Sequence, residues 1–180
     1  MREFQIDGHL VLVGLPGAGK STVGRAVAKV LRRPFLDFDS EIERRTGQSV
    51  PRIFAEHGEG AFRAMETALS RELAAAPPMV LAPGGGWVTN PGVMALLRPP
   101  GRIIHLRLSP AAALKRLTRS RVVRPLLQRA DPAATMEALW AARAHLYQQA
   151  DAELDVEDVD SQRVIDAVVA LAHDRTAGLG

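Results

Sequence analysis

The sequence predicts a three-layer α/β domain in which helices cover both faces of a parallel sheet. Short apolar runs alternate with longer segments of helical periodicity along the 180 residues. A glycine-rich loop joins the first apolar run to the first helical segment. No linker-like stretch, repeat or low-complexity block divides the chain, so residues 1–180 are expected to form one domain. Because crossovers between parallel strands are right-handed, the alternation favours a parallel sheet enclosed by helices.

The N-terminal half contains three apolar runs that predict strands. They are His9–Gly14, Pro34–Phe38 and Met79–Ala82. The segment between the first two predicts a helix, because its valines and its last leucine lie on one face. Four helices are expected here: Lys20–Leu31, Ser40–Thr46, Val50–His57 and Glu59–Ala75. Three consecutive glycines, at 84–86, follow the third strand.

The C-terminal half continues the same alternation. Two further strands are predicted, over Arg102–Leu108 and Glu153–Val156. The expected helices are Pro91–Leu97, Pro110–Thr118, Pro132–Gln149 and Gln162–His173. Residues 119–130 have no clear periodicity and are expected to form a loop, and the tail 174–180 is expected to fray.

Composition excludes several classes of protein. An apolar fraction of 47% with 24% charged residues is ordinary for a globular domain. No apolar run approaches the roughly 18 residues that cross a bilayer, and no small-residue cleavage site follows the N-terminal apolar stretch. We therefore expect a cytoplasmic protein without a membrane partner. The absence of cysteine excludes disulfides, thiolate zinc sites and cysteine nucleophiles, and the five histidines lack the spacing of a metal cluster.

The basic residues are unevenly divided between the two types. Only Lys20, Lys29 and Lys115 among the 23 are lysines, and the rest are arginines. Arginine binds carboxylate and phosphate groups in a bidentate manner, so this bias is consistent with oxyanion recognition. A GC-rich coding bias gives the same composition. Only the positions of individual arginines can separate the two explanations.

Residues 14–21, GLPGAGKS, fit the phosphate-loop pattern GxxxxGK[ST]. Glycines let the backbone curl so that successive N–H groups face phosphate oxygens, and the following helix adds its positive dipole end. Lys20 is expected to bridge the β- and γ-phosphates, and Ser21 to offer its hydroxyl to Mg²⁺. The nucleotide contacts are predicted at Gly17, Ala18, Gly19, Lys20, Ser21 and Thr22. A dinucleotide-binding loop is disfavoured, because Thr22 stands where that pattern has its third glycine.

The acid that helps to hold Mg²⁺ in many phosphate-loop proteins is absent from the ends of strands three and four. Asp37 and Asp39 close the second strand instead. Residues two apart on a strand share a face, so both carboxylates are predicted to face the phosphate loop. One can serve the metal while the other accepts a proton from a hydroxyl, an arrangement that suits a small kinase. The alternative is a capping pair for the helix that follows.

The sequence resembles the shikimate kinase family over nearly the whole chain. The segments that carry the resemblance are GLPGAGKSTVG (14–24), FLDFDSEIE (35–43), VPRIFAEHGEGAFRAMET (50–67), PGGG (83–86), RPLL (124–127) and RAHLYQQAD (143–151). The resemblance implies transfer of the γ-phosphoryl group of ATP to the 3-hydroxyl of shikimate, on the route to chorismate and the aromatic amino acids. It also implies Mg²⁺, a monomer, and a five-stranded parallel sheet of order 2-3-1-4-5. A mobile lid is expected at about 115–130, and substrate-binding helices at about 40–75.

The same resemblance assigns roles to single residues. It makes Asp39 the candidate base and shikimate ligand, and places Asp37 beside Mg²⁺. Arg63, supported by Glu66, and Arg143 would clamp the shikimate carboxylate. The backbone of Gly84, Gly85 and Gly86 would donate to substrate hydroxyls. Arg124 would reach the transferred phosphoryl group, and Arg116 and Arg163 would lie near adenine.

Two alternatives to this activity remain at the level of the sequence. One is another small-molecule kinase, such as a gluconate kinase. The other is a nucleotide-dependent switch or a nucleic-acid-binding module, for which the basic stretch Lys115–Arg129 is the only support. That stretch lacks interleaved aromatic residues and an accompanying motif, so no nucleic-acid partner is expected. Trp87 is expected either to line the substrate pocket or to pack, and Trp140 and Tyr147 are expected to pack in the core.

Overall fold

The computed structural model describes residues 7–119 and 130–173, which contain one five-stranded parallel sheet of order β2-β3-β1-β4-β5. The strands are β1 (Leu10–Val13), β2 (Phe35–Asp37), β3 (Val80–Ala82), β4 (Arg102–Arg107) and β5 (Ala152–Asp155). The expected strand order is confirmed. The central strand β1 is entirely buried, and it pairs with β3 on one side and β4 on the other.

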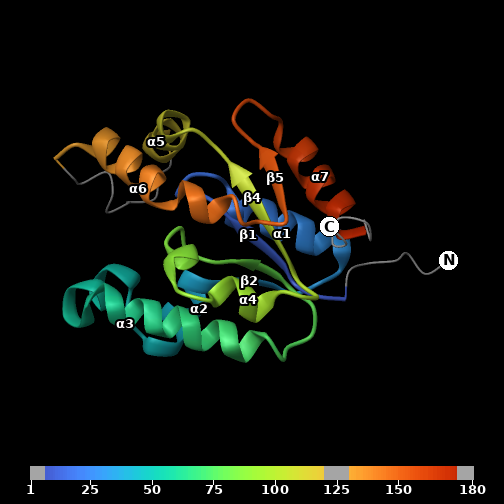
Figure 1. Cartoon of the computed structure of the whole chain (residues 1–180), viewed down its shortest axis with the longest axis horizontal. Coiled ribbons are helices and arrows are strands. Elements are labelled where there is room, and N and C mark those ends of the chain that lie inside the picture. The colour runs from blue at the N-terminus through green and yellow to red at the C-terminus, as the bar shows by residue number, and fades with distance from the viewer. Residues whose placement is uncertain (1–6, 120–129, 174–180) are drawn as a thin grey trace.

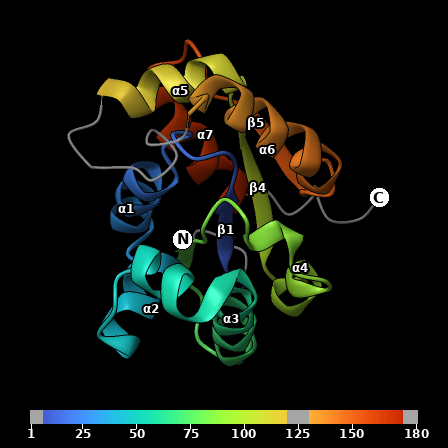
Figure 2. The same cartoon turned by 90° about the vertical axis from the view of Figure 1, so that its left-hand side faces the viewer.

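Helices cover both faces of this sheet. They are α1 (Lys20–Leu31), α2 (Phe38–Thr46), α3 (Val50–Leu73), α4 (Val93–Leu97), α5 (Pro110–Arg119), α6 (Pro132–Tyr147) and α7 (Ser161–His173). A short 3₁₀ helix, η1 (Trp87–Thr89), follows β3. Figure 2 shows α1 on one side of β1 and β4, and α4 on the other. α1 packs against α7, α3 packs against α4, and the sheet lies between the two pairs.

The direction of the crossovers explains this layering and locates the site. The chain passes from β1 toward one edge of the sheet to form β2, whereas the connections after β2, β3 and β4 run toward the other edge. Right-handed crossovers in opposite directions place their helices on opposite faces. The direction reverses between β1 and β3, and ligands of open parallel sheets bind beyond the carboxyl ends of strands at such a point. The phosphate loop follows β1 and the three glycines follow β3, so both border this crevice.

The two helices expected over Val50–His57 and Glu59–Ala75 form the single element α3, which is interrupted by a kink. Gly58 breaks the helical conformation with φ 81° and ψ 168°. The predicted junction is thus confirmed, although the second half ends at Leu73. The expected bounds of α1 are confirmed at both ends, the other boundaries lie within two residues of the expected ones, and η1 has no counterpart among the predicted elements.

One boundary corrects the sequence prediction for the acidic pair. The second strand ends at Asp37 and α2 begins at Phe38, so Asp39 lies in the first turn of a helix. The two carboxylates therefore do not share a strand face. Asp37 is the N-cap of α2 and accepts a hydrogen bond from the Ser40 backbone N–H at 3.1 Å. This cap starts the helix directly at the end of the strand.

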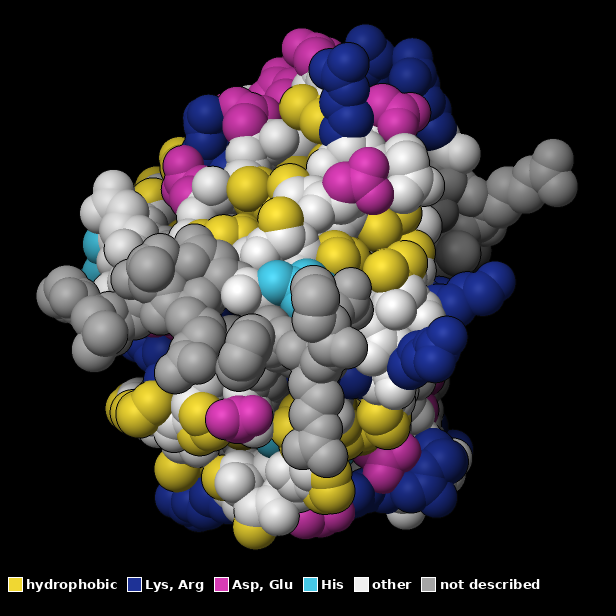
Figure 3. All heavy atoms as spheres, turned by 90° about the vertical axis from the view of Figure 1, so that its right-hand side faces the viewer, with side chains coloured by type: hydrophobic (Ala, Val, Ile, Leu, Met, Phe, Trp, Pro, Cys, Tyr) yellow, Lys and Arg dark blue, Asp and Glu magenta, His cyan; other side chains and the backbone are white. Residues whose placement is uncertain are grey.

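In Figure 1, α3 and α6 project to the left, and the arrow of β4 points up and to the left. Figure 3 shows the right-hand side, where Lys and Arg side chains are interspersed with Asp and Glu over the described residues. Among the helices of residues 7–119 and 130–173, none is long and apolar enough to cross a membrane.

Candidate active site

The phosphate loop leaves β1 and enters α1 through backbone conformations that require glycine. Gly14, Gly17 and Gly19 have φ of 150°, 90° and 91°, and residues with a Cβ rarely adopt such values. Gly19 is the N-cap of α1, so the free N–H groups of that helix open toward the loop. Lys20 Nζ donates to the carbonyl oxygens of Gly14 at 2.9 Å and Leu15 at 3.1 Å. The loop thus has the donor-rich concave form of an anion site.

A hydroxyl and a carboxylate meet beside this loop. Ser21 Oγ donates to Asp37 Oδ2 at 2.5 Å. Both are hard oxygen ligands, which suit Mg²⁺, an ion that commonly takes one or two protein ligands and completes its shell with phosphate and water. Within the described ranges, no group of three or more His, Cys, Asp and Glu side chains could hold a metal without such help. The pair therefore fits a magnesium ion that arrives with a nucleotide. Asp37 also caps α2, so the capping alternative is confirmed for Asp37.

Asp39 lies in the first turn of α2, two residues after Asp37. Its Oδ1 atom is buried and has no hydrogen-bond partner within the described residues. Burial is the main cause that raises the pKa of Asp39, and the charge of Asp37 adds to it, while Lys20 and Arg63 oppose the shift. A buried carboxylate with a free oxygen and a raised pKa is suited to hold a hydroxyl and to accept its proton.

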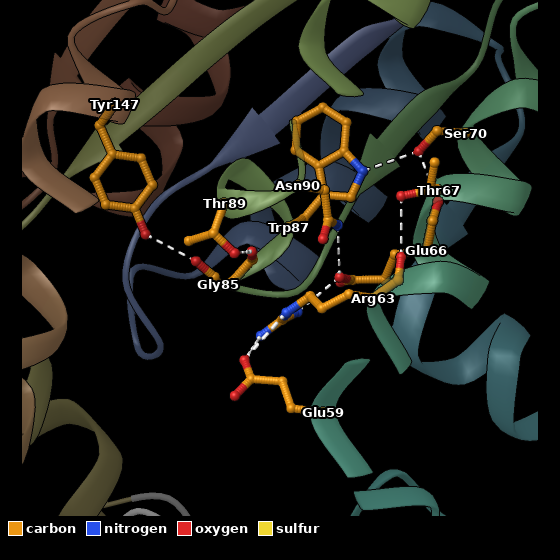
Figure 4. Close-up of polar contacts among 11 residues, drawn as sticks. Glu59, Arg63, Glu66, Thr67, Ser70, Gly85, Trp87, Thr89, Asn90 and Tyr147 are labelled. Atoms are coloured by element: carbon orange, nitrogen blue, oxygen red, sulfur yellow. Dashed lines mark hydrogen bonds and ion pairs between the residues drawn. The ribbon is translucent and has the colours of Figure 1, made fainter. Parts of the chain in front are cut away.

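Arg63 projects from α3 between two carboxylates of the same helix (Figure 4). One terminal nitrogen donates to Glu66 Oε2 at 2.6 Å and the other to Glu59 Oε1 at 2.8 Å. The side chain of Glu66 is 0% exposed, whereas that of Glu59 is 62% exposed. Burial acts to lower the pKa of Arg63, but the two carboxylates outweigh it and raise the pKa. The expected support by Glu66 is present, and Glu59 is a second partner that the motifs of the sequence do not identify. Its i,i+4 spacing from Arg63 was the signal that could have revealed it.

The side chains of Asp39, Glu66 and Arg143 converge on the glycine loop, residues 84–86. A methyl group added at Gly84 would lie 3.0 Å from Asp39 Oδ1 and 3.2 Å from Glu66 Oε1. At Gly85 it would lie 3.1 Å from Pro16 Cδ of the phosphate loop and 3.4 Å from a terminal nitrogen of Arg143. The phosphate loop, the two arginines and Asp39 therefore meet at one loop, which must lack side chains to admit them.

Arg143 reaches the glycine loop from α6, which is held to the sheet by stacked rings. His105 of β4 stacks on Tyr147 with ring centroids 4.6 Å apart, and Trp140 stacks on both at 6.2 Å. The Tyr147 side chain donates its hydroxyl to the Gly85 carbonyl oxygen at 3.1 Å (Figure 4). Burial raises the pKa of Tyr147 to about 12, although the neighbouring Arg143 cation opposes the shift. Tyr147 was expected only to pack, and no sequence signal predicts its contact with the loop.

The remaining predicted residues lie apart from this cluster or outside the described part of the chain. Arg116 donates to the backbone carbonyl oxygens of Val156 and Glu157, just after β5. Arg163 is exposed on α7. Arg124 and most of the expected lid fall within residues 120–129, which lie outside the described residues. Trp87 is fully buried and bonded to Ser70, so it packs rather than lines the site.

Comparisons with known proteins agree on one family. The sequence model of the family described as "SKI: Shikimate kinase" matches residues 16–172. A shikimate kinase of Pseudomonas entomophila is 45% identical over 87% of this chain and 91% of that protein. The solved shikimate kinase of Acinetobacter baumannii in complex with shikimate has a TM-score of 0.85 and 36% identity, and the match covers 93% of this chain and 94% of the other. A gluconokinase structure from Sinorhizobium meliloti matches at 17% identity and a TM-score of 0.62, with 93% of this chain and 95% of that chain covered, which shows a shared fold alone.

Proposed function

The chain belongs to the shikimate kinase family and is an ATP-dependent kinase, and we propose that its crevice transfers the γ-phosphoryl group of ATP to the 3-hydroxyl of shikimate. One observation carries the assignment of roles. Two guanidinium groups, those of Arg63 and Arg143, reach the same glycine loop beside the buried carboxylate of Asp39. This arrangement fits a small acceptor that has a carboxylate at one end and hydroxyls at the other. We further propose that the enzyme acts as a cytoplasmic monomer.

ATP binds through the phosphate loop in this proposal. The N–H groups of residues 17–22 hold the phosphate oxygens, and Lys20 neutralises the charge between the β- and γ-phosphates. Ser21 and Asp37 would hold Mg²⁺, which when bound neutralises phosphate charge and orients the phosphates. Arg116 and Arg163 flank the loop after β5, and we assign this region to the adenine ring.

Shikimate binds on the other side of the crevice. The Arg63 and Arg143 guanidinium groups clamp its carboxylate, because bidentate charge-assisted hydrogen bonds fix both position and orientation. The backbone of the glycine loop donates to its hydroxyls. Asp39 Oδ1, which lacks a partner in the described chain, accepts the hydrogen bond of the reacting hydroxyl.

Phosphoryl transfer then needs little more than alignment and neutralised charge. The 3-hydroxyl oxygen of shikimate forms a bond to the γ-phosphorus while the bond from that phosphorus to the β–γ bridging oxygen breaks. ADP leaves with the bridging oxygen, and the hydroxyl proton passes to Asp39. We assign Arg124 to the charge on the transferred group, as the resemblance implies.

A coupled assay of ADP release tests the function directly. With ATP and Mg²⁺ present, we expect release that depends on shikimate, and none above background with gluconate. Gluconate has no ring, so it cannot present hydroxyls to Asp39 in the way that shikimate does while a carboxylate is bound by Arg63 and Arg143. Release with gluconate and not with shikimate would replace the proposed substrate.

Replacement of Gly86 by alanine is expected to weaken shikimate binding. The added methyl group would lie 2.0 Å from an Arg63 terminal nitrogen, so the guanidinium must move. Loss of a charge-assisted hydrogen bond costs about 2 kcal/mol, which corresponds to an increase of about thirtyfold in KM for shikimate. Steady-state kinetics with each substrate varied in turn should show little change in KM for ATP.

Gly60→Ala is the matched control for this substitution. Gly60 lies three residues before Arg63 on the same helix, and a methyl group there meets nothing within 4 Å. We expect unchanged kinetics and a slight gain in stability, because alanine favours the helix. An unchanged KM for shikimate in Gly86→Ala would contradict the assigned place of Arg63.

A further inference from the structure

The buried carboxylate behind Arg63 has a second hydrogen-bond donor, on a different element. Asn90 Nδ2 donates to Glu66 Oε2 at 3.0 Å, the same oxygen that accepts from Arg63 at 2.6 Å (Figure 4). Asn90 is only 6% exposed and Glu66 is 0% exposed. Burial of a charged carboxylate without hydrogen-bond donors costs free energy. These two donors therefore determine the position of the Glu66 carboxylate and whether it stays charged.

Asn90 is itself fixed by the glycine loop. It closes η1, the 3₁₀ helix that starts directly after Gly86, and its backbone N–H donates to the Trp87 carbonyl oxygen at 3.0 Å. Its own carbonyl oxygen accepts from Val93 N–H at 3.2 Å, at the start of α4. The side-chain amide therefore extends from the segment that forms the floor of the site to the helix that carries Arg63.

A second contact joins the same two elements but does not touch Arg63 or the Glu66 carboxylate. Trp87 Nε1 donates to Ser70 Oγ at 2.9 Å, and Ser70 Oγ donates to the Glu66 backbone oxygen at 2.8 Å. Because this contact lies one helical turn beyond Glu66, it can hold η1 on α3 when the amide of Asn90 is removed. The contact from Asn90 thus reaches the carboxylate that pairs with Arg63, whereas the contact between Trp87 and Ser70 only attaches η1 to α3.

We propose that Asn90 is a positioning residue for substrate binding: its amide holds the buried Glu66 carboxylate so that Arg63 is aimed at the carboxylate of the substrate. The inference rests on the proposed function, because it requires that Arg63 bind the shikimate carboxylate. The position demands a donor. Leucine would leave the Glu66 carboxylate with Arg63 as its only hydrogen-bond partner among the described residues, and aspartate would place a second carboxylate against it.

The electrostatics of Glu66 agree with this role. Burial raises the pKa of Glu66, while Arg63 and the hydrogen bond from Asn90 act to lower it. Loss of the amide therefore favours a neutral Glu66, which no longer attracts the guanidinium. Arg63 would then turn toward the exposed Glu59, its other partner on α3.

The experiment measures KM and kcat of the full-length enzyme for both substrates in Asn90→Leu, which is similar in size but cannot donate. We expect KM for shikimate to rise about tenfold, the cost of one lost hydrogen bond to a charged group, with kcat and KM for ATP within about twofold. Preference for shikimate over an analogue with a hydroxymethyl group in place of the carboxylate should fall by the same factor. In a Glu66→Met background, Asn90→Leu should change KM by less than about twofold, because the acceptor is gone.

Ser70→Ala is the control, since it removes the contact between Trp87 and Ser70. Its midpoint of thermal unfolding should fall while KM for shikimate stays within about twofold. The proposal is overturned if Asn90→Leu leaves KM for shikimate unchanged or raises KM for both substrates alike. It is equally overturned if the penalty persists in the Glu66→Met background, or if Ser70→Ala has the same effect. Wild-type enzyme without shikimate-dependent turnover would instead remove the proposed function itself.

Discussion

Asp39→Asn is expected to lower the rate of shikimate phosphorylation by about a thousandfold, the usual scale for loss of a general base. The amide keeps the size of the side chain and can still bond to a hydroxyl, but it cannot accept the proton. Asp39 lies in the first turn of α2, and its Oδ1 atom is buried at the glycine loop with no hydrogen-bond partner among residues 7–119 and 130–173. The phosphate loop leads into α1, whereas Asp39 lies on α2. Binding of ATP should therefore change by no more than about twofold.

Single-turnover kinetics and a direct titration with ATP separate these two effects. Glu41→Gln is the matched control, because Glu41 occupies the same turn of α2 but pairs with the exposed Arg44 and Arg45. It should leave both turnover and ATP binding unchanged. Retention of more than about a tenth of the wild-type rate in Asp39→Asn would mean that Asp39 orients the hydroxyl without taking its proton.

The sequence predicts what depends on local pattern. Apolar runs and helical periodicity locate the strands and helices, because burial on one or both faces leaves a period in the sequence. The phosphate loop can also be predicted from the sequence, since its glycines adopt backbone conformations that other residues avoid. The strand order follows only from the family resemblance, because periodicity does not determine which strands are neighbours.

Prediction from the sequence fails where one side chain contacts two secondary-structure elements. The apolar run Pro34–Phe38 predicts a strand with Asp39 at its end. The strand instead ends one residue earlier, at Asp37, which caps a helix that begins two residues earlier than predicted, at Phe38. The sequence does not predict the contacts of Asn90 and of the Tyr147 hydroxyl, because their partners, Glu66 and Gly85, are 24 and 62 residues away. Contacts of such range depend on tertiary packing and leave no local period.

Arg63→Ala is expected to reduce both stability and binding. Within the described residues, the substitution leaves the buried Glu66 carboxylate with Asn90 as its only donor. Removal of one partner from a buried ion pair costs about 3 kcal/mol of unfolding free energy. Affinity for shikimate should fall by at least about thirtyfold, because half of the carboxylate clamp is lost. Chemical denaturation and a shikimate titration measure the two losses.

The loss of stability should depend on pH in a direction that identifies its cause. Burial already raises the pKa of Glu66 above 4.5, and removal of Arg63 takes away the charge and hydrogen bond that oppose it. The folded variant then keeps the Glu66 proton at a pH where the unfolded chain has released it. Its unfolding free energy therefore falls as pH rises above about 4.5, and its deficit against wild type is smaller near pH 5 than near pH 8.

A second substitution separates the two roles of Arg63. Arg63→Ala combined with Glu66→Leu removes the stranded carboxylate and should recover most of the lost stability, because a buried apolar side chain replaces an unpaired charge. It should not recover affinity for shikimate, since the guanidinium is still absent. Recovery of both properties would show that Arg63 serves only to neutralise Glu66. Recovery of neither would mean that the cost of Arg63→Ala arises from packing rather than from the buried charge.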